Sequence, residues 1–147
     1  MNLEHNCRNV IAAILTLFLL SCGTSGHIKF YSFGATKSEI QNQISSIISK
    51  DSQFTVPKKW LECTTGDYFE RYYIYFSKNP EEMYQIGFTG DSLEWNNSSS
   101  SKLGLIAVYD GKIFKYESDL SSREIKRIEK RFEEEILSKL SLPYQSQ

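Results

Sequence analysis

The sequence predicts an α+β fold: a single antiparallel sheet of about five strands with two helices packed mainly on one face, in the order β-α-β-β-β-β-α. Two segments repeat apolar residues at helical spacing directly after a capping-box pair. Strand-like runs rich in aromatic and β-branched residues occupy most of the remainder. Asp110-Gly111 stands between two of these runs, which is a strong signal for a β-hairpin.

The first predicted helix follows a strand-like run at residues 28–33. Thr36 and Glu39 have the spacing of a capping box, in which a hydroxyl and a carboxylate satisfy free backbone amides at the start of a helix. Isoleucines then recur along one helical face, at Ile40, Ile44, Ile47 and Ile48. This pattern predicts a helix over residues 37–49, followed by a turn at residues 51–59.

The middle of the chain is predicted to form a hairpin. Residues 68–76 are almost continuously aromatic and apolar, which favours a strand, and Asn79-Pro80 interrupts this run. Residues 83–89 form the next predicted strand. The polar segment at residues 90–102 contains four consecutive serines and is expected to be a mobile loop.

The second predicted hairpin joins residues 103–109 to residues 112–117 through Asp110-Gly111. We expect a two-residue type I′ turn, which requires a positive φ at both positions. The resulting cross-strand pairs are Tyr109 with Lys112, Ala107 with Phe114, and Leu105 with Tyr116. Both faces of this hairpin are apolar, so we expect it to lie well inside the sheet or to be covered on both sides.

The last predicted helix begins at a second capping box, formed by Ser121 and Glu124. Its apolar stripe consists of Ile125, Ile128, Phe132, Ile136 and Leu140. Pro143 marks the end of the helical pattern.

The first 22 residues carry the most specific signal in the chain. Residues 10–20 are apolar, without a charged side chain, and are too short to span a bilayer comfortably, since a spanning helix needs about 20 residues. Such a run suits the apolar segment of a secretory signal. It ends in Leu19-Leu20-Ser21-Cys22, which resembles the lipobox of bacterial lipoproteins.

This resemblance implies a division of the chain into three parts. Residues 1–21 would be a signal peptide that is removed, Cys22 would be lipidated through its sulfur and often acylated on its new amino group, and residues 22–27 would be a short tether. Residues 28–147 would form the single α+β domain. The glycine at position 23, in place of aspartate, resembles the pattern of outer-membrane lipoproteins that face the periplasm.

Composition and residue counts argue against several chemistries. A net charge of −1 over 147 residues argues against nucleic acid binding. The predicted mature chain retains one thiol, Cys63, and one histidine, His27, which are too few for a structural zinc site. No phosphate-binding loop or dinucleotide fingerprint is present. We therefore expect no catalytic site, no cofactor and no metal, while Cys63 is either a packed side chain or a reactive thiol.

Two sets of residues are candidates for binding. Phe69, Tyr73 and Tyr75 share one side of the predicted strand at residues 68–76 and form a partner-binding face if the helices cover only the opposite side of the sheet. The alternative is that these aromatics pack across strands or lie under a loop.

The second set is basic and lies in the first half of the last predicted helix. Arg123, Lys126, Arg127 and Lys130 are candidate contacts to anionic headgroups near the tether. The alternative is a solvated helix face with ion pairs at helical spacing, such as Lys130 with Glu134.

These observations predict a non-catalytic, lipid-anchored protein of the cell envelope that binds a protein partner close to the membrane. The reach from Cys22 to Ile28 is at most about 20 Å, so the domain must work near its membrane. The alternative is an inhibitor or immunity-type lipoprotein that neutralises an envelope-directed enzyme.

Overall fold

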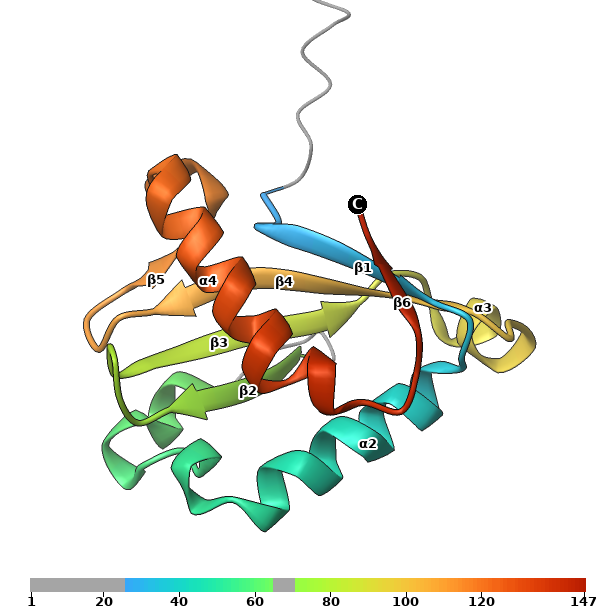
Figure 1. Ribbon diagram of the computed structural model, residues 1–147, viewed down its shortest axis with the longest axis horizontal. Helices are drawn as coiled ribbons and strands as arrows, with labels where there is room; N and C mark the ends of the chain where they lie inside the picture. Colours follow the sequence, from blue (N-terminus) through green and yellow to red (C-terminus); the bar gives the residue numbers. More distant parts are fainter. Residues whose placement is uncertain (1–25, 65–70) are drawn as a thin grey trace, which may run out of the picture.

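A computed structural model describes residues 26–64 and 71–147. Within these residues an antiparallel sheet of six strands has the order β2-β3-β4-β1-β6, and β5 pairs with β4 (Figure 1). The strands are β1 (Lys29–Phe33), β2 (Arg71–Phe76), β3 (Glu82–Phe88), β4 (Ser101–Tyr109), β5 (Phe114–Lys115) and β6 (Tyr144–Ser146). The predicted α+β class is confirmed.

Both predicted long helices are present, as α2 (Lys37–Lys50) and α4 (Ser122–Glu135). Each begins at its predicted capping box: the Glu39 amide donates to Thr36 Oγ1 and the Glu124 amide donates to Ser121 Oγ, both at 3.3 Å. Shorter elements connect the rest, namely η1 (Ser52–Phe54), η2 (Lys58–Thr64), α3 (Ser92–Asn97), η3 (Glu117–Asp119) and η4 (Leu137–Lys139).

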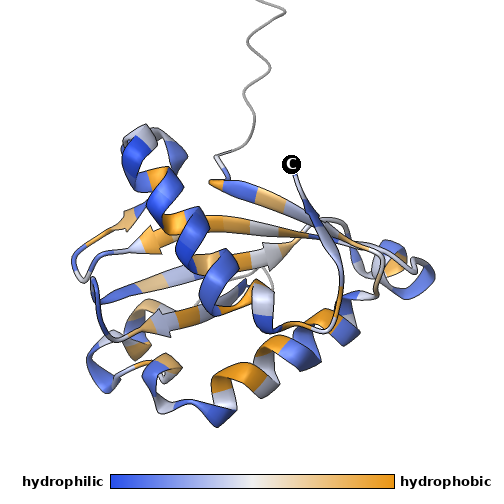
Figure 2. Ribbon diagram, in the orientation of Figure 1, coloured by the Kyte–Doolittle hydropathy of each residue, from blue (hydrophilic) through white to orange (hydrophobic). Residues whose placement is uncertain are grey.

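The main core lies between the sheet and the two long helices. Ile40 and Ile44 from α2 and Ile128 and Phe132 from α4 are buried in one cluster with the inward side chains of the sheet. Figure 2 shows the corresponding division of each helix into an apolar side and a hydrophilic side. Full burial of each such side chain contributes about 1.5–3 kcal/mol, so the helical stripe is what holds α2 and α4 on this face.

The predicted register of the second hairpin is wrong by two residues. Tyr109 pairs with Phe114 instead of Lys112, and the loop has four residues. Asp110 causes the difference, because its Oδ1 accepts hydrogen bonds from the amides of Lys112 (2.9 Å) and Ile113 (3.1 Å). A type I′ turn needs a positive φ at both central residues, and of this pair only the glycine, at 92°, has one.

An irregularity in β4 also changes which side chains share a face. Gln85 of β3 lies opposite Ala107, but Ile86 lies opposite Leu105, so Ile106 is an extra residue in β4. Leu105 therefore faces the main core, whereas Ala107 points to the other side of the sheet. A strict alternation places both on one face, which is why the predicted faces of this strand are wrong.

The serine-rich segment is not the expected mobile loop. It contains α3, and its last two residues begin β4. The short strand β6 was not predicted; it pairs with β1, with Phe33 opposite Tyr144, and closes that side of the sheet.

Candidate functional site

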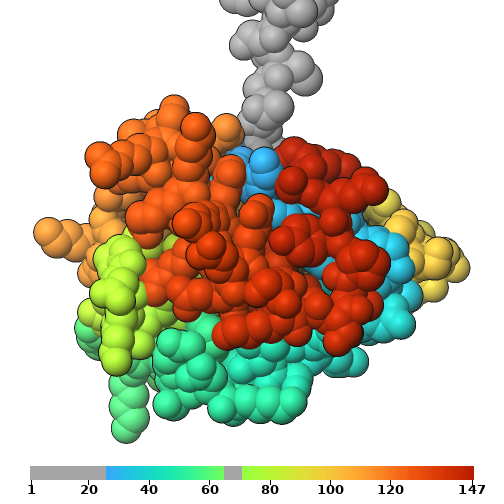
Figure 3. Space-filling view, viewed as in Figure 1, coloured from blue at the N-terminus to red at the C-terminus, as the bar shows by residue number. Residues whose placement is uncertain are grey.

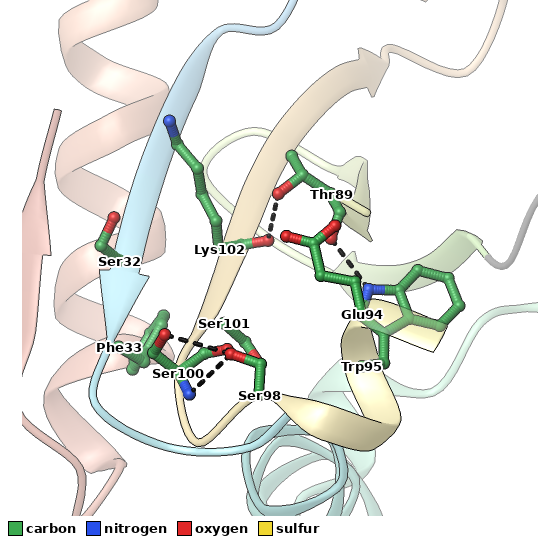
Figure 4. Close-up of a pocket in the computed structure, with 9 residues that line it drawn as sticks. All are labelled: Ser32, Phe33, Thr89, Glu94, Trp95, Ser98, Ser100, Ser101 and Lys102. Carbon is green, nitrogen blue, oxygen red and sulfur yellow. Dashed lines mark hydrogen bonds between the residues drawn. The ribbon is translucent and has the colours of Figure 1, made fainter. Parts of the chain in front are cut away.

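The candidate site is a polar groove at the end of β1, beside α3 (Figure 4). It encloses about 220 Å³ and is lined by Ser32, Phe33, Thr89, Glu94, Trp95, Ser98, Ser100, Ser101 and Lys102. A second hollow of about 430 Å³ shares three of these residues and continues past Pro143 and Tyr144 toward β6. Hydroxyls, one ammonium and one carboxylate line the first hollow, so the groove offers hydrogen-bond donors and acceptors to a polar ligand or to the rim of a protein interface.

The position of α3 is fixed by three interactions, although the helix has only six residues. The Asp91 carboxylate caps it by accepting from the amides of Leu93 (2.9 Å) and Glu94 (3.0 Å). Trp95 Nε1 donates to the Thr89 carbonyl at 2.8 Å. Lys37 of α2 places its Nζ 3.4 Å from the centre of the Trp95 ring. The short helix is therefore held to both the sheet and α2.

The serines after α3 are ordered by their own side chains. Ser98 Oγ donates to the Ser100 carbonyl at 2.7 Å and accepts from the Ser100 amide at 3.1 Å, as Figure 4 shows. Such local bonds are an alternative to regular structure and favour a turn. This turn leads directly into β4 and forms one wall of the groove.

Leu93 is the exposed apolar residue of α3. It is 71% exposed, more than any other large apolar side chain among residues 26–64 and 71–147. A single exposed leucine is ordinary on a protein surface. This one lies on a firmly held helix beside a polar groove, and an apolar anchor next to polar groups is the usual layout of a protein interface.

Sequence reasoning missed this site, although a signal for it was present. Asp91 precedes Glu94 by three residues, which is the spacing of a helix start, and Trp95 is an isolated large aromatic residue in a polar segment. The four consecutive serines that follow favour a loop, so the sequence predicted a loop here instead of a helix.

The predicted aromatic face is largely covered. Phe69 lies outside the described residues. Tyr75 is only 8% exposed, because Trp60 of η2 packs against it with ring centroids 5.2 Å apart at 87°. Tyr73 is half-buried and its hydroxyl accepts a hydrogen bond from Gln85 Nε2 at 3.0 Å. The expectation that this side of the sheet is open is wrong for Tyr75, because η2, which begins at the end of the predicted turn and was not itself predicted, packs over it.

The covered side forms a second cluster around Trp60. Its buried members are Trp60, Tyr75 and Met83, and its half-buried members include Cys63 and Tyr109. A hydrogen bond with the thiol raises the pKa of the Tyr109 hydroxyl. Burial, together with a 2.7 Å hydrogen bond to Glu81, raises the pKa of Tyr75 to about 12. Both tyrosine hydroxyls are therefore neutral at ordinary pH.

Cys63 and His27 belong to different parts of the sheet. Cys63 packs with the cluster over β2 and β3, whereas His27 stacks on Phe30 of β1 with centroids 4.6 Å apart. Within the residues that the structure describes, no group of three or more His, Cys, Asp or Glu side chains is arranged to hold a metal ion.

Arg127 is engaged within the fold. Its guanidinium donates two hydrogen bonds to the buried carboxylate of Glu82, of 2.8 and 2.6 Å. The prediction that Arg127 is free to contact headgroups is therefore wrong.

The other three basic residues of the set are exposed. Arg123 and Lys126 form no ion pair with a described residue. Lys130 lies 3.7 Å from Glu134, and both side chains are largely in solvent. A pair of this kind contributes little, so the three cations are accessible.

The predicted lipidation site, Cys22, lies outside the described residues. Among the helices that the structure does describe, none has the length and apolarity needed to cross a membrane.

No protein-family model matches the chain, and neither the curated proteins nor the solved structures contain a match.

Proposed function

We propose that the chain is a non-catalytic, lipid-anchored protein of the cell envelope that binds a protein partner close to the membrane, and that α3 and the adjoining groove form the binding surface. The resemblance of Leu19-Leu20-Ser21-Cys22 to a lipobox supports the anchor. Leu93 supports the partner site, because it is exposed on a helix that three separate interactions hold in place.

The position of the groove along β1 suits this role. The chain enters the sheet at the start of β1, and the groove lies at the other end of the strand, four residues later (Figure 1). At about 3.3 Å per residue this separation is roughly 13 Å. A partner therefore reaches α3 without competing with the tether.

The test is photo-crosslinking in cells that produce the full chain. A photoreactive amino acid replaces Leu93 in one variant and Ile113 in a matched control, since Ile113 is also an exposed apolar residue, at 60%, but lies in the β4–β5 loop. We expect one discrete adduct at position 93 that is weak or absent at position 113. Equal adducts at both positions, or none at position 93 while the protein is folded and present in membranes, contradict the proposed surface.

The alternative proposal, an inhibitor or immunity-type lipoprotein, is also favoured by α3. A short, firmly held helix with an apolar tip suits insertion into the cleft of an enzyme. The identity of the adduct separates the two proposals. An envelope-degrading enzyme at position 93 favours the inhibitor, and an envelope assembly or transport protein favours the first proposal.

A further inference from the structure

The described chain begins beside the start of α4. A Cβ atom at Gly26 would lie 4.0 Å from the Cβ of Tyr116. Tyr116 directly precedes η3, which leads into α4. In the space-filling view the first described residues, in blue, border the orange residues of this region (Figure 3). The point where the tether joins the domain is therefore close to the N-terminal turns of α4.

The exposed cations of α4 form one stripe. Arg123, Lys126 and Lys130 are three and seven positions apart, which places them on one side of a helix. Ile128 and Phe132 on the opposite side are buried in the main core. The stripe, which we call the basic stripe, therefore points away from the sheet.

Two of the acidic residues near the basic stripe accept hydrogen bonds from backbone amides at the starts of η3 and α4. Asp119 Oδ2 accepts a hydrogen bond from the Tyr116 amide at 3.0 Å, and Glu124 closes the capping box with Ser121. The hydrogen bonds from the Ser121 hydroxyl and amide lower the pKa of Glu124, so this carboxylate stays ionised and offsets part of the charge of the stripe. Glu117 and Glu134 remain exposed and partly offset the stripe.

The tether length brings this region to the membrane. Gly26 is four positions after Cys22, and an extended chain of that length reaches at most about 14 Å. A lipid on Cys22 thus holds Gly26, and Tyr116 beside it, within roughly one to two Debye lengths of the headgroups. Basic side chains at that distance are attracted by an anionic surface.

We propose that the basic stripe contacts anionic lipid headgroups and sets the orientation of the anchored domain, with α4 toward the membrane and α3 directed away from it. This inference rests on the proposed lipid anchor and adds the part of the domain that meets the lipid. A lipid tether alone leaves the domain free to rotate, whereas a second contact beside the tether limits the rotation and keeps the groove open to a partner.

The experiment uses the mature lipidated protein in phosphatidylcholine vesicles, with or without phosphatidylglycerol, that carry a nitroxide on the headgroup. A fluorophore is attached at Ser122→Cys or, in a second sample, at Leu93→Cys, both in a Cys63→Ser background. We expect strong quenching at position 122 that depends on phosphatidylglycerol and weak quenching at position 93. Combined reversal by Arg123→Glu, Lys126→Glu and Lys130→Glu is expected to abolish most of the phosphatidylglycerol-dependent quenching.

The control reverses two charges elsewhere, with Lys50→Glu at the end of α2 and Lys58→Glu at the start of η2, both at exposed positions. This control is expected to keep the quenching at position 122. Equal quenching at both labelled positions, or quenching unaffected by phosphatidylglycerol or by reversal of the basic stripe, overturns the inference while leaving the anchor intact. Protein that does not float with the vesicles overturns the anchor and the inference together.

Discussion

Glu82 on β3 and Arg127 on α4 form a two-hydrogen-bond ion pair at the edge of the main core, with N···O distances of 2.8 and 2.6 Å. The same carboxylate accepts a hydrogen bond from the Tyr84 hydroxyl at 3.2 Å and lies 3.7 Å from the Arg131 guanidinium. Arg131 in turn donates to the carbonyls of Lys78 and Pro80 in the β2–β3 connection. This network joins α4 to that connection and fixes where the helix crosses the sheet.

Glu82→Gln is expected to destabilise the fold by about 2 kcal/mol. The substitution removes the charge that pairs with Arg127 and Arg131. A hydrogen bond to a charged group contributes about 1.5–3 kcal/mol, and the contribution of this pair is reduced because Arg127 is partly solvated. Urea denaturation measures the change. Glu134→Gln, which breaks the exposed pair with Lys130, is the control and is expected to change stability by less than about 0.5 kcal/mol. Similar effects for both variants would contradict a special role for Glu82.

Trp60→Ala is expected to cost about 3–5 kcal/mol, because Trp60 is 5% exposed and fills the centre of the second cluster against Tyr75 and Tyr109. Thermal unfolding provides the measurement. Trp95→Ala is the matched control, and its effect is expected to be clearly smaller, since Trp95 is half-exposed and lies outside both buried clusters, with contacts to Lys37 and Thr89. If Trp60→Ala costs no more than Trp95→Ala, η2 is not a firm cover of the sheet.

Asp91→Ala is expected to loosen α3 without unfolding the domain. The carboxylate caps two amides, and loss of an N-cap costs about 1 kcal/mol, which is large for a helix of six residues. Hydrogen exchange followed by mass spectrometry should show faster exchange in residues 92–97 and unchanged exchange in β3 and β4. Asp51→Ala, which removes the cap of η1, is the control and should leave α3 unaffected. If α3 binds the partner, the adduct at position 93 weakens in Asp91→Ala.

Asp110 predicts a specific pH dependence. Hydrogen bonds from the Ile113 amide and from Lys115 lower the pKa of its carboxyl to about 2, from an ordinary value of 3.8. The folded value lies below the unfolded one, so the charge stabilises the fold at every pH above about 4, and this contribution is lost as the pH falls from about 4 to about 2.

Asp110→Asn provides the test. Asparagine keeps an acceptor for the two loop amides but carries no charge and cannot form the 3.0 Å pair with Lys115. The difference in unfolding free energy between the natural chain and the variant is expected to be constant above about pH 4 and to shrink below it. Urea titrations at a series of acidic pH values measure this difference, and a difference that grows with acid would be the opposite of the expected result.

The long helices and their starts could be predicted from the sequence because their determinants are local. Thr36 with Glu39, and Ser121 with Glu124, satisfy amides within one turn of themselves. The isoleucine spacing behind each box defines a face that must be buried, whatever it packs against. The α+β class follows from these helices and the strand-like runs.

The register of the second hairpin and the order of the serine-rich segment could not be predicted in the same way. Asp110 binds the loop amides with its side chain and so replaces the expected turn, and Ile106 adds a residue to β4. The helix α3 is too short to show an apolar period, and besides the Asp91 cap it depends on contacts with Lys37 and Thr89, which lie outside it.

The sequence by itself determined the starts and apolar faces of the two long helices and the likeness of the first 22 residues to a lipoprotein signal, because each depends on residues within a few positions of one another. Only the tertiary structure decided that Trp60 covers Tyr75, that Arg127 is paired with Glu82, and that Leu93 is presented beside a groove. Each of these depends on contacts between segments that are distant along the chain or on exposure in the folded protein. Such contacts form only when the sheet order brings the segments together, and nothing in the local pattern of either partner specifies the other.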